Sequence, residues 1–247
     1  MNSETRACVL SAHNGQGWYH KGQQRLERTL NHHGFSHDIV TVKCTQHGNG
    51  WVVSGTINGK SFEPWHASEY PSDCVYTLKA AAWDFARNQG YDVILWLDCS
   101  VWPVKPIEPL FDLIESEGYY FWRSGFSLGQ TCGQHCLDYF QIDREASFDI
   151  HDTSTSMMGL KLSNPIAWDF YHQWLTSAKR GMFHGSRAAI PGATGRQQLF
   201  EHRQDQSAAS CLTHKLKMKL HDPGIISQYA NESGKYPDTV KLVMRGM

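Results

Sequence analysis

The chain has 247 residues, of which 40% are hydrophobic and 19% are charged, and its formal net charge is -1. This length suits one α/β domain with a full hydrophobic core, or at most two small domains. Because the net charge is close to zero, the composition gives no electrostatic footprint for a protein that binds duplex DNA chiefly through its phosphates, which leaves only a local basic groove open. We predict a single domain over 1–247, with its core at about 7–223 and a C-terminal tail at 224–247.

The cysteines favour reduced thiols over a disulfide framework. They are odd in number and fall mostly in predicted strands and helices, as expected of a cytosolic protein. They are Cys8, Cys44, Cys74, Cys99, Cys132, Cys136 and Cys211. The Cys132-Gly-Gln-His135-Cys136 stretch lacks a second ligand pair at zinc-ribbon spacing, so we expect ordinary loop thiols there. No N-terminal apolar segment and no bilayer-length apolar run is present, so we expect a soluble, cytoplasmic chain.

The first half of the chain alternates predicted strands and helices. Apolar and β-branched runs favour strands, whereas apolar residues at helical spacing favour helices. The predicted strands are 7–12, 37–43, 51–57, 60–62 and 91–97, and the predicted helices are 21–33 and 76–89. Asn58-Gly59 separates two of these strands, and this dipeptide is the preferred turn of a tight hairpin. A small ribbon therefore interrupts the alternation.

The second half keeps the alternation but contains two irregular stretches. Strands are expected at 119–122, 156–162 and 217–221, and helices from about 107 to 114, from 165 onward and at 205–216. The polar segment 123–155 has weak periodicity, which favours a functional loop. The segment 179–196 carries several glycines and is interpreted as a lid. The pattern as a whole predicts one mixed α/β domain.

The strand at 91–97 ends on Asp98, and Ser100 follows two residues later. In an open parallel sheet, ligands bind beyond the carboxyl ends of the strands, so both side chains are expected in a binding crevice. The alternative is a strand that ends on aspartate only because aspartate is a common turn residue.

Asp98-Cys99-Ser100 resembles the Asp-x-Asp strand end of GT-A type nucleotide-sugar glycosyltransferases, with serine in place of the second carboxylate. The resemblance extends in order over roughly 7–223. It includes Ser156-Met-Met-Gly159-Leu-Lys-Leu162, the helix containing Trp174, the Asp205-Gln206 helix start and His221-Asp222. It implies a single GT-A-like, Rossmann-like domain with a mixed central sheet.

The activity implied by this resemblance is transfer of a sugar from a nucleoside-diphosphate sugar, with a UDP-hexose as the expected donor. The acceptor would be a hydroxyl on a glycan, a small molecule or a modified DNA base, and retention or inversion stays open. Two other classes remain: a sugar nucleotidyltransferase, which normally has a glycine-rich signature after the first strand, and a non-catalytic carbohydrate-binding protein with an aromatic surface.

The resemblance also assigns a divalent cation, Mn²⁺ or Mg²⁺, to Asp98, Ser100 and His221. A nucleoside diphosphate leaves with added negative charge, which a cation held against it would stabilise. The competing account is that basic side chains from Lys79, Arg123 or Arg203 neutralise the diphosphate without a metal.

The remaining candidates follow from the same resemblance. Asp205, expected as a helix N-cap, would bind sugar hydroxyls or accept the acceptor proton, with Gln206 as its partner and Arg123 in the same cleft. Asp149 and Asp152 are alternatives for an acceptor-side base, or else lie in a solvated loop. The full set expected to bind the nucleotide sugar is Ala12, Trp18, Tyr19, Lys79, Asp98, Ser100 and Arg203, with an aromatic ring stacked on the base.

Overall fold

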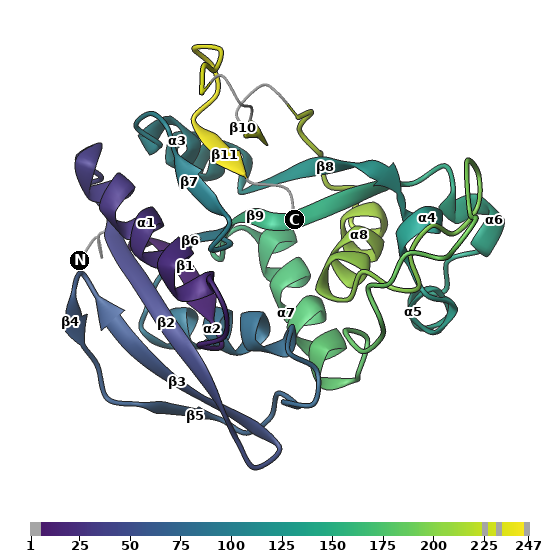
Figure 1. Ribbon diagram of the computed structural model, residues 1–247, viewed down its shortest axis with the longest axis horizontal. Helices are drawn as coiled ribbons and strands as arrows, with labels where there is room; N and C mark the ends of the chain where they lie inside the picture. Colours follow the sequence, from purple (N-terminus) through teal and green to yellow (C-terminus); the bar gives the residue numbers. More distant parts are fainter. Residues whose placement is uncertain (1–5, 224–226, 231–233, 245–247) are drawn as a thin grey trace.

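A computed structural model describes residues 6–223, 227–230 and 234–244 and shows a mixed sheet with helices on both faces (Figure 1). The sheet has eight strands in the order β4-β3-β2-β1-β6-β9-β8, and β5 pairs with β3. Its strands are β1 (Ala7–His13), β2 (Asp38–His47), β3 (Gly50–Ile57), β4 (Lys60–Ser61), β5 (Trp65–Ala67), β6 (Val93–Leu97), β8 (Tyr119–Ser127) and β9 (His151–Lys161). This mixed α/β architecture confirms the predicted fold class.

The centre of the sheet is parallel and mostly buried. β1 pairs in parallel with β2 on one side and with β6 on the other, whereas β9 pairs with β6 in the antiparallel direction. Every residue of β6 is buried, as expected of a strand covered on both faces. Because β1 and β6 are parallel neighbours, their carboxyl ends lie at the same edge of the sheet.

Two hydrophobic clusters cover the two faces. The helices are α1 (Tyr19–His32), α2 (Thr77–Asn88), α3 (Glu108–Glu117), α4 (Leu128–Thr131), α5 (Gln134–Phe140), α6 (Arg144–Ser147), α7 (Pro165–Lys179) and α8 (Asp205–Lys215). On one face, α1 and α3 contribute buried residues such as Leu26 and Ile114. On the other, α2, α7 and α8 contribute Trp83, Trp174 and Leu212.

The hairpin prediction at Asn58-Gly59 is confirmed. β3 and β4 pair in antiparallel register, and both turn residues have positive φ values, 50° at Asn58 and 76° at Gly59. Asparagine and glycine tolerate this left-handed backbone better than other residues, which is why the pair favours a two-residue turn.

Two sequence predictions are wrong. The segment 123–155 is not one loop, because β8 continues to Ser127, three short helices follow and β9 already begins at His151. The first and third of these helices start at local caps, Ser127 and Asp143, and helices this short show no periodicity. The segment 217–221 is not a strand, since Lys217 has a φ of 54° and only His221 forms an isolated bridge, to Trp122.

A second, small sheet lies beside the carboxyl end of β6. It joins β7 (Val101–Pro103), β11 (Leu242–Met244) and β10 (Ser227–Tyr229), and β11 pairs with β7 in the antiparallel direction. These short strands were not predicted from the sequence. Among the described residues, no helix combines the length and apolar character needed to cross a membrane.

Candidate active site

A cavity of about 570 Å³ opens where β1 and β6 end. Residues from widely separated parts of the chain line it, including the loop after β1, the first turn of α2, the middle of β9 and the start of α8. Of the predicted site residues, the lining contains Ala12, Tyr19, Lys79, Asp98, Ser100, Arg203, Asp205 and Gln206. The crevice therefore lies at the edge of the sheet where the sequence analysis placed it.

Lys79 forms two ion pairs in the cavity. Its ammonium lies 3.0 Å from Asp98 Oδ1 and 2.9 Å from Asp205 Oδ2, and it donates to the carbonyl of Thr155 at 3.2 Å. Burial alone would lower the pKa of Lys79, but the carboxylates of Asp205 and Asp98 raise it well above its usual range. Lys79 therefore stays protonated, and its ion pairs connect α2 to the residue after β6 and to the start of α8.

Asp98 is held in place from two sides. Its Oδ1 accepts a hydrogen bond from Trp96 Nε1 at 2.7 Å in addition to the ion pair with Lys79. The turn after it lies directly against α1, because a Cβ on Gly22 would stand 2.3 Å from the carbonyl oxygen of Cys99. A glycine in the helix interior is therefore required by the close approach of this turn.

Asp205 and Gln206 begin α8, as predicted, although the N-cap residue is Gln204 and not Asp205. Gln206 donates from Nε2 to Asp152, and Ser124 donates to the same carboxylate. Asp152 also accepts from Ser210 Oγ at 2.7 Å. Burial raises the pKa of Asp152, while these hydrogen bonds oppose the shift. Asp152 is fully buried and positions Gln206 and Ser124, both of which line the cavity.

Two arginines, Arg187 and Arg203, also line the cavity. Arg187 lines the cavity from the irregular segment after α7 and donates from Nη1 to the hydroxyl of Tyr76. Arg203 lies with its guanidinium 5.6 Å from the ring centre of Phe126 and 5.3 Å from that of Phe200. These two rings and two guanidinium groups form a surface suited to anions and planar or sugar rings.

Three predicted site residues are not among the residues that line the cavity. His221 places its Nε2 3.2 Å from Glu117 Oε2, next to the ring of Tyr120. Arg123 forms an ion pair with Asp222 at 2.9 Å. Trp18 is 41% exposed and stacks on Tyr19, whose ring does line the cavity.

The alternative acceptor-side bases also lie outside the lining. Asp149 forms an exposed ion pair with Arg196 at 2.7 Å, and Asp152 is enclosed beneath Gln206. Neither carboxylate faces the cavity directly.

Within the described part of the chain, the side chains predicted as ligands do not by themselves form a site for Mn²⁺ or Mg²⁺. These cations prefer about six oxygen ligands. Here the predicted set contributes only the Asp98 carboxylate, one oxygen of which already binds Lys79 and Trp96, and the Ser100 hydroxyl. The third predicted ligand, His221, is bound to Glu117.

Comparison with known proteins supports the fold. No family model and no curated protein matches the sequence. Among solved structures, a glycosyltransferase involved in glycosylation of the major capsid of PBCV-1 is 14% identical, with 97% of this chain and 93% of that chain covered and a TM-score of 0.50. The galactosyltransferase LgtC, described in complex with donor and acceptor sugar analogues, is 8% identical, with 96% and 86% covered and a TM-score of 0.50. The chain has a GT-A-like glycosyltransferase fold.

Within this GT-A-like domain, several cavity residues were missed by the sequence analysis. Arg187 belongs to the glycine-bearing segment interpreted as a lid, so a basic residue in that segment could have been predicted as a cavity residue. Tyr76 and Met244 had no such signal, because only tertiary packing brings the first turn of α2 and strand β11 to the cavity.

Proposed function

We propose that this GT-A-like chain is a glycosyltransferase that moves a hexose from a nucleoside-diphosphate sugar, with UDP-hexose as the expected donor, to a hydroxyl acceptor. The observation that carries the proposal is the position of the Lys79 ammonium. It forms ion pairs with Asp98 at a strand end and with Asp205 at a helix start, inside one cavity of a glycosyltransferase-like fold. Donor and acceptor sugar analogues are named for one of the similar structures, which supports a two-substrate cavity.

The nucleotide would bind near the end of β1. Ala12 and the ring of Tyr19 line that side of the cavity, and the base would stack on the Tyr19 ring. When the bond between the sugar C1 and the diphosphate oxygen breaks, negative charge grows on the diphosphate. Arg187 and Arg203 would stabilise this charge, because guanidinium groups bind phosphate oxygens through paired hydrogen bonds.

The sugar would lie against the start of α8. The ion pair with Lys79 holds Asp205 in place, and its carboxylate can bind sugar hydroxyls or accept the proton of the acceptor hydroxyl. Gln206, oriented by Asp152, would hold a further sugar hydroxyl. The rings of Phe126 and Phe200 offer an apolar surface for the acceptor, whether a glycan, a small molecule or a modified base.

Enzymes of this fold commonly use a divalent cation together with a nucleotide sugar. In this chain Asp98 and Ser100 are the predicted ligands that reach the cavity, so Mn²⁺ or Mg²⁺ would depend on the nucleotide for most of its ligands. We therefore assign neutralisation of the diphosphate to Arg187 and Arg203, which extends the account based on basic side chains that the sequence analysis left open.

Calorimetry with UDP, GDP, ADP, CDP and TDP sugars tests the proposal, with and without Mn²⁺. We expect at least one donor to bind, and Arg203→Gln to weaken its binding. Asp149→Asn, in an exposed ion pair outside the cavity, is the matched control and should bind normally.

The product identifies the reaction class. A glycosyltransferase releases nucleoside diphosphate in the presence of acceptor, whereas a sugar nucleotidyltransferase releases pyrophosphate. A carbohydrate-binding protein would bind glycans without any nucleotide. Absence of binding by all five nucleotide-sugar classes would refute the proposal.

A further inference from the structure

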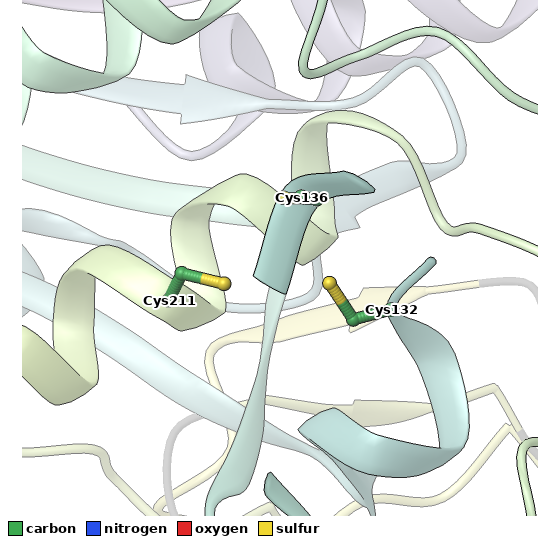
Figure 2. A group of neighbouring side chains, drawn as sticks. All are labelled: Cys132, Cys136 and Cys211. Atoms are coloured by element: carbon green, nitrogen blue, oxygen red, sulfur yellow. The ribbon is translucent and has the colours of Figure 1, made fainter. Parts of the chain in front are cut away.

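Three of the seven cysteines meet at one point away from the cavity. Cys132 directly follows α4, Cys136 lies in α5 and Cys211 lies in α8, and their Sγ atoms are all within 4.8 Å of one another. All three residues are fully buried. Figure 2 shows the Cys132 and Cys211 sulfurs pointing toward each other, and the helix that carries Cys136 lies between them in this view.

The other cysteines are dispersed. Each of three has a separate backbone partner: Cys44 donates to the carbonyl of Leu78, Cys74 to that of Phe183 and Cys99 to that of Ala12. Cys132 also donates to a backbone carbonyl, that of Gly133, at 3.5 Å, but among the described residues Cys132, Cys136 and Cys211 are the cysteines whose sulfurs lie together. The convergence of Cys132, Cys136 and Cys211 therefore indicates a shared ligand.

The geometry favours a metal over a disulfide. A disulfide joins two sulfurs at about 2.05 Å and would leave the third cysteine unused. Tetrahedral zinc, with Zn–S bonds of about 2.3 Å, places its sulfur ligands roughly 3.8 Å apart. Three sulfurs that surround a common point at this scale suit the second arrangement.

A buried imidazole lies beside the loop that carries Cys132. His202 is only 2% exposed, and its Nδ1 accepts from the backbone N–H of Gly133 at 3.1 Å. Its Nε2 lies 2.9 Å from the carbonyl oxygen of Met182, so both ring nitrogens already have partners. Three cysteines and one histidine form a common ligand set of structural zinc sites, but here the histidine would first have to give up one of these hydrogen bonds.

We propose that Cys132, Cys136 and Cys211 bind a structural Zn²⁺ through their thiolates. His202 would supply the fourth ligand only by releasing its hydrogen bond to Gly133 or to Met182. On binding, each thiol releases its proton to solvent and forms a metal–sulfur bond. Sulfur ligands select zinc over Mg²⁺ and Mn²⁺, so this site differs in chemistry from any cation carried by a diphosphate.

The position of this site gives it a structural consequence. It joins α4 and α5 to α8, whose first two residues, Asp205 and Gln206, line the cavity. Zinc would therefore fix the helix that presents these side chains. The proposal does not rest on the proposed glycosyl transfer, because metal content is measured without any substrate.

Elemental analysis of the full chain, expressed with added zinc and purified without chelator, tests the inference. We expect about one zinc ion per chain. Cys132→Ser, Cys136→Ser and Cys211→Ser should each lower this content at least severalfold and lower the melting temperature. Cys44→Ser is the matched control: it also alters a fully buried thiol, and it should keep the zinc.

Because a serine in the core can also unfold the chain, a second measurement uses the unaltered sequence. Replacement of zinc by Co²⁺ should give the intense thiolate-to-cobalt charge-transfer absorption of a tetrahedral thiolate site. Folded protein without bound zinc and without this absorption would overturn the inference. So would mass spectrometry showing a disulfide between two of these three cysteines.

Discussion

Lys79 is buried with its ammonium between two carboxylates, so its removal would leave Asp205 as an uncompensated buried charge. We expect Lys79→Met to lower the free energy of unfolding by about 3–5 kcal/mol, the usual cost of breaking a buried pair from one side. Asp98 is 31% exposed and contributes less because solvent screens it. Urea denaturation measures the change.

A double-mutant cycle separates this charge effect from lost packing. Lys79→Met combined with Asp205→Asn removes both charges of the more deeply buried pair, so we expect part of the lost stability to return. Strict additivity of the two single changes would show that the pair does not interact energetically.

Asp205→Asn tests the chemistry at the start of α8. Gln204 is the N-cap, so the helix does not depend on the Asp205 carboxylate for capping. We expect donor affinity close to normal and a transfer rate lower by roughly two orders of magnitude, the usual size of an acid-base contribution. Steady-state kinetics with saturating donor measures the rate. An unchanged rate would show that the role of Asp205 is limited to its ion pair with Lys79.

At the level of single residues, the sequence could predict which types of side chain reach the cavity but not their partners. Asp98, Lys79 and Asp205 were all candidates, yet no pattern shows that one ammonium lies between the two carboxylates. The direction of His221 depends on Glu117, which lies far from it in the sequence. Tertiary packing determines which partners these side chains contact.

The strands and helices were easier to predict because burial imposes a period on the sequence. β6 is buried on both faces and reads as a continuous apolar run, whereas α4, α5 and α6 are too short to show a period. β7 and β11 are short and stabilise each other only when paired, so neither has a strong signal of its own.

The contact between α1 and the turn after β6 supports a prediction at this scale. Alanine in place of a helical glycine normally stabilises by about 0.5–1 kcal/mol. At Gly22, the new Cβ would meet the Cys99 carbonyl at 2.3 Å, so we expect Gly22→Ala to destabilise by about 1–3 kcal/mol. Donor affinity should also fall, because Cys99 lies between Asp98 and Ser100. Gln24→Ala, on the same helix, is the control for helix propensity, and equal effects would contradict the steric account.

The irregular segment between α7 and α8 gives a second prediction. Arg187 and Arg203 face the cavity, whereas Arg196 is exposed and offers a site for trypsin. If bound diphosphate holds the two inner arginines, cleavage after Arg196 should slow severalfold when donor is present. Cleavage after the exposed Lys60, on the distant β4 edge, should keep its rate. Equal rates with and without donor at Arg196 would show that the segment does not act as a lid.

For the whole molecule, the assignment of charge neutralisation to arginines predicts the response to chelation. We expect transfer in EDTA to stay within severalfold of the rate with Mn²⁺, and Arg187→Gln or Arg203→Gln to lower it at least tenfold. Complete loss of transfer in EDTA, restored by Mn²⁺, would instead show that a cation stabilises the negative charge on the leaving diphosphate.

The position of Lys79 also has a kinetic consequence. Its partners come from β6 and from α8, and the second of these lies far from α2 in the sequence. Closing such a long stretch of chain is entropically costly, and contacts of this kind usually form late in folding. During refolding, most secondary structure should therefore return before the protein regains its capacity to bind donor.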